Sequence, residues 1–253
     1  MDLKNLKNDF KSKGYFKILN FFDKYTIKNL NDEIKVIAKE KPKNIFFYQD
    51  RNNLIRRMEH FYNHTQLLDN INNKIQITLK NIFDKKFFLF KDKYNFKPPK
   101  GEGFFPHYDG IFNWKDKNGK WRKGWHEYAD EFVNVLILLD DFNNENGPLE
   151  ISKIHDKSFN ELIKNTKQNG TPDLKRDLAN ICQFEKMICP SGSIVIFSSK
   201  CPHQSSKNNS DKDRGSLYYT YNPAIYGNNY TNYFEEKLSS QNKQSKSLSG
   251  EIN

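Results

Sequence analysis

The sequence predicts an α+β protein, with helices gathered at the start of the chain and a β sandwich or barrel after them. Up to about residue 85, apolar residues recur mainly at helical spacing. From about Phe87 onward, short runs rich in β-branched and aromatic residues replace that pattern, with polar or turn residues between them. No internal repeat or linker divides the chain, and its 253 residues suit one domain with a full core.

Two long helices are predicted in the N-terminal part. The first is "TIKNLNDEIKVIAKE", where Thr26 is the expected N-cap residue. The second is "TQLLDNINNKIQITLKNIFDK", in which Thr65 has the same expected role. The stretch "GYFKILNFF" lies between helical segments and predicts a short strand and turn.

Strands are predicted over five segments of the second part. They are "KFFLFKDKYNF", "EFVNVLILLDDF", "GPLEISKI", "GSIVIFSS" and "GSLYYTYNP". Residues 156–185 interrupt the series and predict helix and loop. The end of the chain from Ser239 is poor in apolar residues, so we expect one domain over residues 1–238 and a disordered tail over 239–253.

The composition narrows the class of protein. Apolar residues make up 36% of the chain, and 21 Phe and 13 Tyr enlarge the core they can form. The net charge of +10 comes from basic residues scattered among acidic ones, which argues against general nucleic-acid binding. No apolar stretch approaches the ~20 residues of a membrane span, and the start lacks a signal-peptide core, so we expect a cytoplasmic protein. Three cysteines without a CxxC pair predict free thiols.

The stretch "FFPHYDGIF" contains a possible metal-binding pair, His107 and Asp109. His-x-Asp is common by chance, so the pair needs a third ligand. His203 is the best candidate, because it follows the apolar strand "SIVIF" and could sit at a strand end facing the mouth of a barrel. Two histidines and one carboxylate on a β scaffold are the ligand set of non-haem Fe(II) oxygenases.

An anionic co-substrate at such a centre needs a cation at its far end. Arg214 lies eleven residues after His203, at the head of the next strand, and a guanidinium binds a carboxylate through two parallel hydrogen bonds. Ser205 can add a hydroxyl donor to the same carboxylate. The alternatives are a plain surface charge for Arg214 and a solvated loop residue for Ser205.

Four segments in this order resemble the phytanoyl-CoA dioxygenase family of Fe(II)/2-oxoglutarate oxygenases. They are "GYFKILNFF", "PHYDG", "VLILLDDFNNENGPLEISKIH" and "HQSSKNNSDKDR", which together span roughly residues 13 to 223. The resemblance implies a double-stranded β-helix with helices packed on one sheet. It implies Fe(II) as cofactor and 2-oxoglutarate and O₂ as co-substrates, with succinate and CO₂ released as a C–H bond is hydroxylated.

The same resemblance suggests roles for other residues. Asn134 could contact 2-oxoglutarate or satisfy a backbone group of the sheet. Lys97 could face the site, although a solvent-facing loop lysine is favoured. His155 stands in "SKIH", where the family often has Pro-Gly-Ser-His, so its structural role is open.

The segment after Asp109 is long and variable in the family, which leaves the substrate unidentified. Its loop 115–123 predicts either a solvated hairpin around "KNGK", which we favour, or a lid that attracts an acidic substrate. Candidate substrate contacts are Trp114, Trp121, Arg122 and Trp125. All three tryptophans of the chain lie here, which favours a role in packing or in the substrate wall.

The expected function is therefore hydroxylation of a small metabolite, with an anionic one favoured. A nucleic-acid demethylase of the same superfamily is disfavoured, since Thr220 stands where a second arginine would follow Arg214. A halogenase is disfavoured because Asp109 is present. A non-catalytic metal- or ligand-binding β-barrel is the remaining alternative. The sequence predicts no nucleic-acid or membrane partner and leaves the oligomeric state open.

Overall fold

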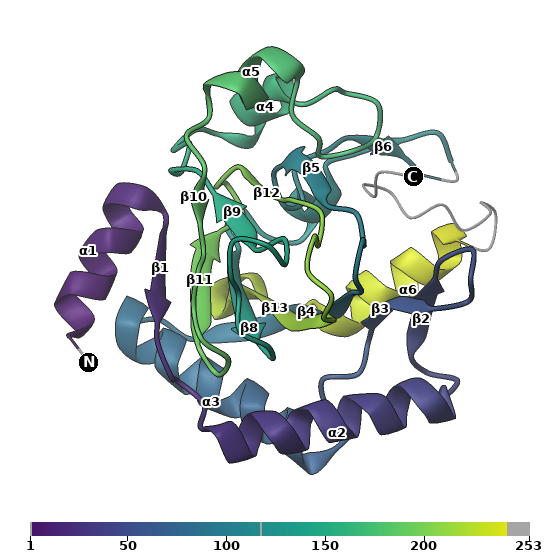
Figure 1. Ribbon diagram of the computed structural model, residues 1–253. Helices are drawn as coiled ribbons and strands as arrows, with labels where there is room; N and C mark the ends of the chain where they lie inside the picture. The colour runs from purple at the N-terminus through teal and green to yellow at the C-terminus, as the bar shows by residue number, and fades with distance from the viewer. Residues whose placement is uncertain (1, 117, 242–253) are drawn as a thin grey trace.

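Two facing antiparallel sheets form the centre of the computed structural model, which describes residues 2–116 and 118–241 (Figure 1). The larger sheet contains β1 (Tyr15–Ile18), β2 (Phe46–Gln49), β3 (Ile55–Glu59), β4 (Phe87–Lys97), β8 (Val133–Leu138), β11 (Ile194–Ser198) and β13 (Arg214–Pro223). The smaller sheet contains β5 (Phe104–His107), β9 (Leu149–Ile151), β10 (Glu185–Lys186) and β12 (His203–Ser205).

The order of the strands identifies the fold. The larger sheet runs β1-β11-β8-β13-β4-β3-β2 and the smaller one β10-β9-β12-β5. The chain crosses from one sheet to the other between β4 and β5, between β8 and β9, and again on each side of β12. Strands that wind in this way between two facing sheets form a double-stranded β-helix, so the predicted fold is confirmed.

Three helices precede or interrupt the first strands: α1 (Leu3–Lys13), α2 (Lys24–Glu40) and α3 (Gln66–Phe83). Helices α2 and α3 cover the outer face of the larger sheet, at the bottom of Figure 1. Thr65 caps α3, as predicted, by accepting a hydrogen bond from the Leu68 amide. The prediction of Thr26 as the cap of α2 is wrong, because Asp23 begins that helix and accepts from the Thr26 amide.

The remaining elements are short. A hairpin pairs β6 (Trp114–Lys115) with β7 (Trp121–Arg122), and a 3₁₀ turn, η1 (Gly124–Glu127), follows it. The predicted helix and loop at 156–185 contains α4 (Phe159–Leu162), η2 (Ile163–Asn165) and α5 (Arg176–Ile181). After β13 come η3 (Ala224–Tyr226) and α6 (Tyr230–Gln241).

Two boundaries differ from the expectation. Strands β2 and β3 lie inside the region expected to be mainly helical, and they extend the larger sheet past β4. Helix α6 continues to Gln241, three residues into the predicted tail, while residues 242–253 lie outside the described residues. Across the described ranges, every helix is too short or too polar to cross a lipid bilayer.

Alternation along the strands gives the larger sheet two different faces. Its outer face is apolar, with residues such as Val135, Ile196 and Tyr219 packed against α2 and α3. Part of its inner face is apolar, where Tyr15, Leu136 and Phe197 of β1, β8 and β11 pack with residues of the smaller sheet. Beyond these strands the inner face is polar and lines a cavity.

Candidate metal centre

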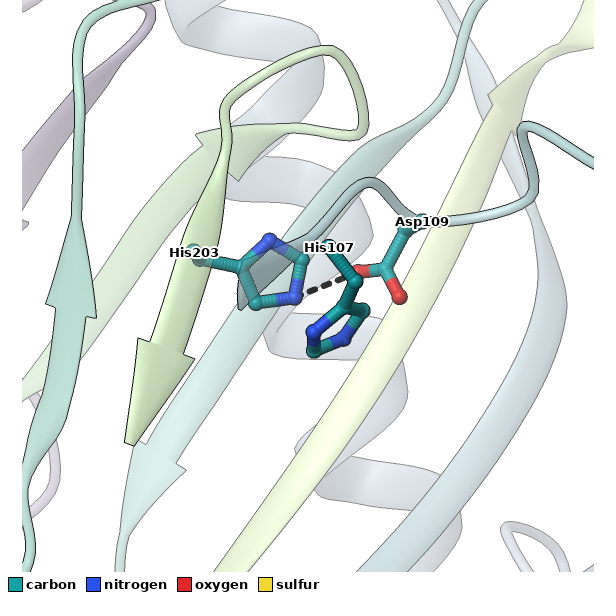
Figure 2. A group of neighbouring side chains, drawn as sticks. All are labelled: His107, Asp109 and His203. Atoms are coloured by element: carbon teal, nitrogen blue, oxygen red, sulfur yellow. Dashed lines mark ion pairs between the residues drawn. The ribbon is translucent and has the colours of Figure 1, made fainter. Parts of the chain in front are cut away.

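Three side chains that are distant in sequence converge between the two sheets. His107 ends β5 and His203 begins β12, and the two residues stand directly opposite each other in the antiparallel pair. Their ring centroids are 4.1 Å apart. Asp109 reaches them from the loop after β5, with its Oδ2 atom 3.4 Å from His203 Nε2 (Figure 2).

Both histidines are held in one orientation. His107 Nδ1 lies 2.7 Å from the Phe105 carbonyl oxygen, and His203 Nδ1 lies 3.0 Å from that of Cys201. A carbonyl oxygen only accepts, so each Nδ1 carries the proton and each Nε2 keeps a lone pair for a metal. Hydrogen bonds of this kind fix the tautomer of metal-binding histidines.

The electrostatics favour a neutral imidazole beside a carboxylate. Burial, reinforced by the nearby His203, lowers the pKa of His107 to about 3. Burial alone would raise the pKa of Asp109, but His203, His107 and nearby lysines bring it below its usual value. One ligand atom from each of the three residues lies within 4.8 Å of the other two, which suits a single divalent ion.

The loop that carries Asp109 is fixed from both sides. The Asp109 amide donates to the Ser199 carbonyl, and buried Tyr108 places its hydroxyl 2.6 Å from His155 Nδ1. Gly110 follows with φ of +73°, and a Cβ there would come within 2.4 Å of the Trp125 ring. Glycine thus lets Trp125 pack directly over the turn beside the ligands.

A cavity of about 340 Å³ opens beside these three side chains. His107, Asp109 and His203 line it together with Ser205. Its volume lies in the range of small-molecule sites.

Arg214 is buried beside Lys97 and does not line this cavity. Its backbone pairs with Lys97, whose ammonium donates to Ser205 Oγ over 2.9 Å. The Nε and Nη1 atoms of Arg214 are buried without a hydrogen-bond partner, and the guanidinium lies 4.4 Å from the centre of the Phe142 ring. Because a buried cation with unused donors is costly, this geometry fits the carboxylate of an anionic ligand.

Residues 10–216 match the family model described as phytanoyl-CoA dioxygenase. The chain belongs to the phytanoyl-CoA dioxygenase family. Curated members of similar sequence include a 2-aminoethylphosphonate dioxygenase from an uncultured bacterium and a methylphosphonate hydroxylase from Gimesia maris. Each is 29% identical over 150 residues, which cover 59% of this chain and 51% and 50% of the relatives. The chain therefore spans about half the length of these relatives.

Solved structures support the fold assignment. EctD from S. alaskensis, crystallised with 2-oxoglutarate and 5-hydroxyectoine, has a TM-score of 0.67 at 15% identity, covering 88% of this chain and 76% of its own. HygX from Streptomyces hygroscopicus, crystallised with nickel and 2-oxoglutarate, has a TM-score of 0.64 at 11% identity, covering 88% of this chain and 87% of its own. Identities this low establish a shared fold alone.

Two predicted family contacts have other roles in the structure. Lys97 does not face solvent; it is buried and donates to the Gly147 and Ser206 carbonyls as well as to Ser205. Asn134 donates from Nδ2 to Asp109 Oδ2 over 2.8 Å and accepts from the Thr220 hydroxyl over 2.7 Å. It therefore bonds a ligand side chain, instead of the backbone group considered from sequence.

Of the four predicted substrate contacts, two line the cavity and two do not. Trp114 and Trp125 line the cavity, whereas Trp121 is 62% exposed and lies outside it. Arg122 does not line the cavity and forms ion pairs with Asp116, Glu127 and Glu236, so it is not available as a substrate contact. The hairpin expected around "KNGK" is present, with Asp116 accepting from the Asn118 and Lys120 amides, while residue 117 lies outside the described residues.

Sequence reasoning missed several polar residues of the cavity wall, among them Arg57, Lys93 and Asn95. A signal was present for two of them. In "KDKYNFK", residues 91–97, every second residue is Lys or Asn. Side chains two residues apart point to the same face of a strand, so these Lys and Asn residues share one face. Arg57 stands in a strand that the helical interpretation of the N-terminal part concealed.

Replacing Asn134 with leucine should weaken divalent-metal binding about 10–100-fold, because Asp109 loses the hydrogen bond that orients it. Thr220→Val removes only the hydroxyl that fixes the amide and should have a smaller effect. Competition with a chromogenic chelator measures the affinity, and thermal melting checks the fold. Wild-type metal affinity in a folded Asn134→Leu protein would show that Asp109 needs no such support.

Proposed function

We propose that the protein is an Fe(II)- and 2-oxoglutarate-dependent dioxygenase that hydroxylates a C–H bond of a small anionic molecule, releasing succinate and CO₂. The observation that carries this proposal is a pair of neighbouring features. Three side chains that could hold one metal ion converge beside a cavity. Arg214, a buried arginine with unused donors, stands next to Lys97, which bonds the cavity-lining Ser205.

The chain's own residues divide the work. His107, Asp109 and His203 hold the metal and leave its other positions for small molecules. Arg214 and Ser205 bind and orient the far carboxylate of the keto acid. Iron(II), when bound, supplies the activation of O₂. The packed tryptophans exclude water from the reacting atoms.

Both the relatives and the electrostatics of the cavity support an anionic substrate. Two relatives are named for activity on phosphonates, and a third is named as a probable hypophosphite dioxygenase from Stutzerimonas stutzeri. The wall of the cavity contains Arg57, Lys91 and Lys93. Cations in a partly enclosed site concentrate anionic ligands.

A succinate-release screen with Fe(II), ascorbate and 2-oxoglutarate tests the proposal. It compares phosphonates, carboxylates and neutral amides of matched size, with His107→Ala as the inactive control. We expect anionic compounds to increase succinate formation by the wild-type protein, and no compound to do so with His107→Ala. Tight binding of metal and keto acid without turnover of any compound would instead indicate a non-catalytic binding protein.

The hairpin at residues 115–123 is proposed to form a charged rim that attracts the substrate. Since Arg122 is paired, the exposed cations Lys120 and Lys123 carry this role. Their combined change to glutamine should raise the substrate KM at low salt about two- to tenfold and flatten its salt dependence. Affinity for 2-oxoglutarate should not change. Wild-type kinetics at low salt would identify the hairpin as a merely solvated turn.

A further inference from the structure

The inner face of the larger sheet is strongly cationic around the cavity. Alternation and register place ten residues of β3, β4 and β13 on this face. They are Arg57, Glu59, Lys91, Lys93, Asn95, Lys97, Arg214, Ser216, Tyr218 and Thr220. Five of these are cations and one is an acid. Such an arrangement is costly to bury unless ligands supply the missing negative charge.

The single acid is already engaged. Buried Glu59 pairs with Lys91 over 3.2 Å and with Lys237 of α6, and it accepts from the Tyr48 hydroxyl. These lysines hold the pKa of Glu59 well below its usual range against the opposing effect of burial. Both ion pairs of Glu59 are with Lys91 and Lys237, and neither is with Arg57 or Lys93.

Arg57 and Lys93 are the cations of the cavity wall that form no ion pair among the described residues, although the Asp109 carboxylate acts on Lys93 from a distance. The Nε atom of Arg57 is buried without a hydrogen bond, and its guanidinium carbon lies 5.7 and 5.8 Å from the centres of the Tyr48 and Phe104 rings. The Lys93 ammonium lies 4.6 Å from the centre of the Tyr218 ring and makes no ion pair or hydrogen bond within the described chain.

Asn95 joins the two cations. It stands opposite Arg57 in the sheet and two residues from Lys93 on the same face of β4. It lines the cavity, and its side chain makes no hydrogen bond within the described residues, so its Nδ2 group can donate to a ligand. Three donor groups from two strands thus border one side of the cavity.

The cofactors would leave this charge in place. The two positive charges of Fe(II) and the two negative charges of 2-oxoglutarate cancel each other, and the Asp109 carboxylate faces the metal, so no ion pair to Arg57 or Lys93 is added. The keto acid's far carboxylate is already assigned to Arg214 and Ser205. Burial, and next the charge of Arg57, lower the pKa of Lys93 to about 7, as expected for an anion subsite without its anion.

We propose that Arg57 and Lys93 bind the head group of the substrate, and that this head group is a tetrahedral, doubly charged oxoanion of the phosphonate class. Two cations match two negative charges, and three separate donors match three oxygen atoms that point in different directions. A planar carboxylate has one charge and two oxygens and would leave one cation unpaired. This inference rests on the proposed function, because it assigns the substrate of the same cavity.

Calorimetric titration of the anaerobic protein, loaded with Fe(II) and 2-oxoglutarate, tests the subsite without turnover. The probes are methylphosphonate, methanesulfonate (tetrahedral with one charge) and acetate (planar with one charge). We expect methylphosphonate to bind at least about tenfold more tightly than the other two. Arg57→Gln and Lys93→Gln should each weaken it by about thirtyfold or more.

The controls separate this inference from the proposed function. Arg51→Gln and Lys28→Gln remove exposed cations and should bind the probe like wild type. Arg57→Lys and Lys93→Arg keep the charge and should retain most of the affinity. Binding of 2-oxoglutarate should be unchanged in every variant, and its failure in the wild type would refute the proposed function itself.

Four results would overturn the subsite. The first two are equal binding of methylphosphonate by wild type and both glutamine variants, and no binding of it by the wild type. Another is a preference for acetate, which would assign a carboxylate head group. The last is a loss of 2-oxoglutarate affinity in Arg57→Gln and Lys93→Gln, which would make these residues part of the keto-acid site.

Discussion

Alanine at position 107 or 203 is expected to abolish stoichiometric binding of Fe(II). Each histidine supplies one of three ligand atoms that lie within 4.8 Å of each other, and its ring is already oriented by a backbone carbonyl. The loss should exceed the roughly 10–100-fold that removal of a supporting hydrogen bond costs. Iron content after anaerobic reconstitution and gel filtration measures it.

His64→Ala is the matched control for these variants, because His64 is exposed and lies outside the three-residue cluster. It should retain iron as the wild type does. If His107→Ala and His203→Ala both kept a full equivalent of iron, the three residues would not be the metal ligands. Melting curves of the apo-proteins establish that the variants are folded.

Arg214→Ala should lower the affinity for 2-oxoglutarate by about two orders of magnitude or more, because a buried charge-assisted pair is lost. Arg214→Lys should also remain well below wild type, since an ammonium cannot reproduce two parallel hydrogen bonds. Anaerobic calorimetry measures both. Arg176→Ala, at an exposed arginine of α5, is the control.

Unchanged keto-acid affinity in Arg214→Ala would assign the carboxylate to another cation. Lys97 would be the first to consider, because it already donates to Ser205. A selective loss in Lys97→Met would then identify it. Arg214 would then have a structural role, through its contact with the Phe142 ring.

The convergence of His107, Asp109 and His203 could be predicted because the signals for it are local in the sequence. His-x-Asp, a later histidine after an apolar strand, and an arginine eleven residues on are all visible in one sequence. The strands that carry them were also visible, because their apolar runs are bounded by turn residues. The structure brings these segments together through the direct pairing of His107 with His203.

Other features depend on contacts that no local pattern reveals. The bond of Asn134 to Asp109 depends on the packing of β8 against a loop 25 residues away in sequence. Arg122 forms an ion pair with Glu236 of α6, which lies more than a hundred residues later in the sequence. Lys97 resembles a loop lysine in sequence because prolines follow it, yet β4 ends on it and buries it.

Because five cations share one face of β3, β4 and β13, we expect the stability of the protein to depend on the anions bound to that face. Repulsion among them opposes folding when no anion is bound. Any anion that binds only the folded face stabilises it, by about 2.7 kcal/mol at a hundred times its dissociation constant. In a cell short of keto acid and substrate, we therefore expect a larger unfolded fraction and faster proteolysis, so that abundance itself follows demand.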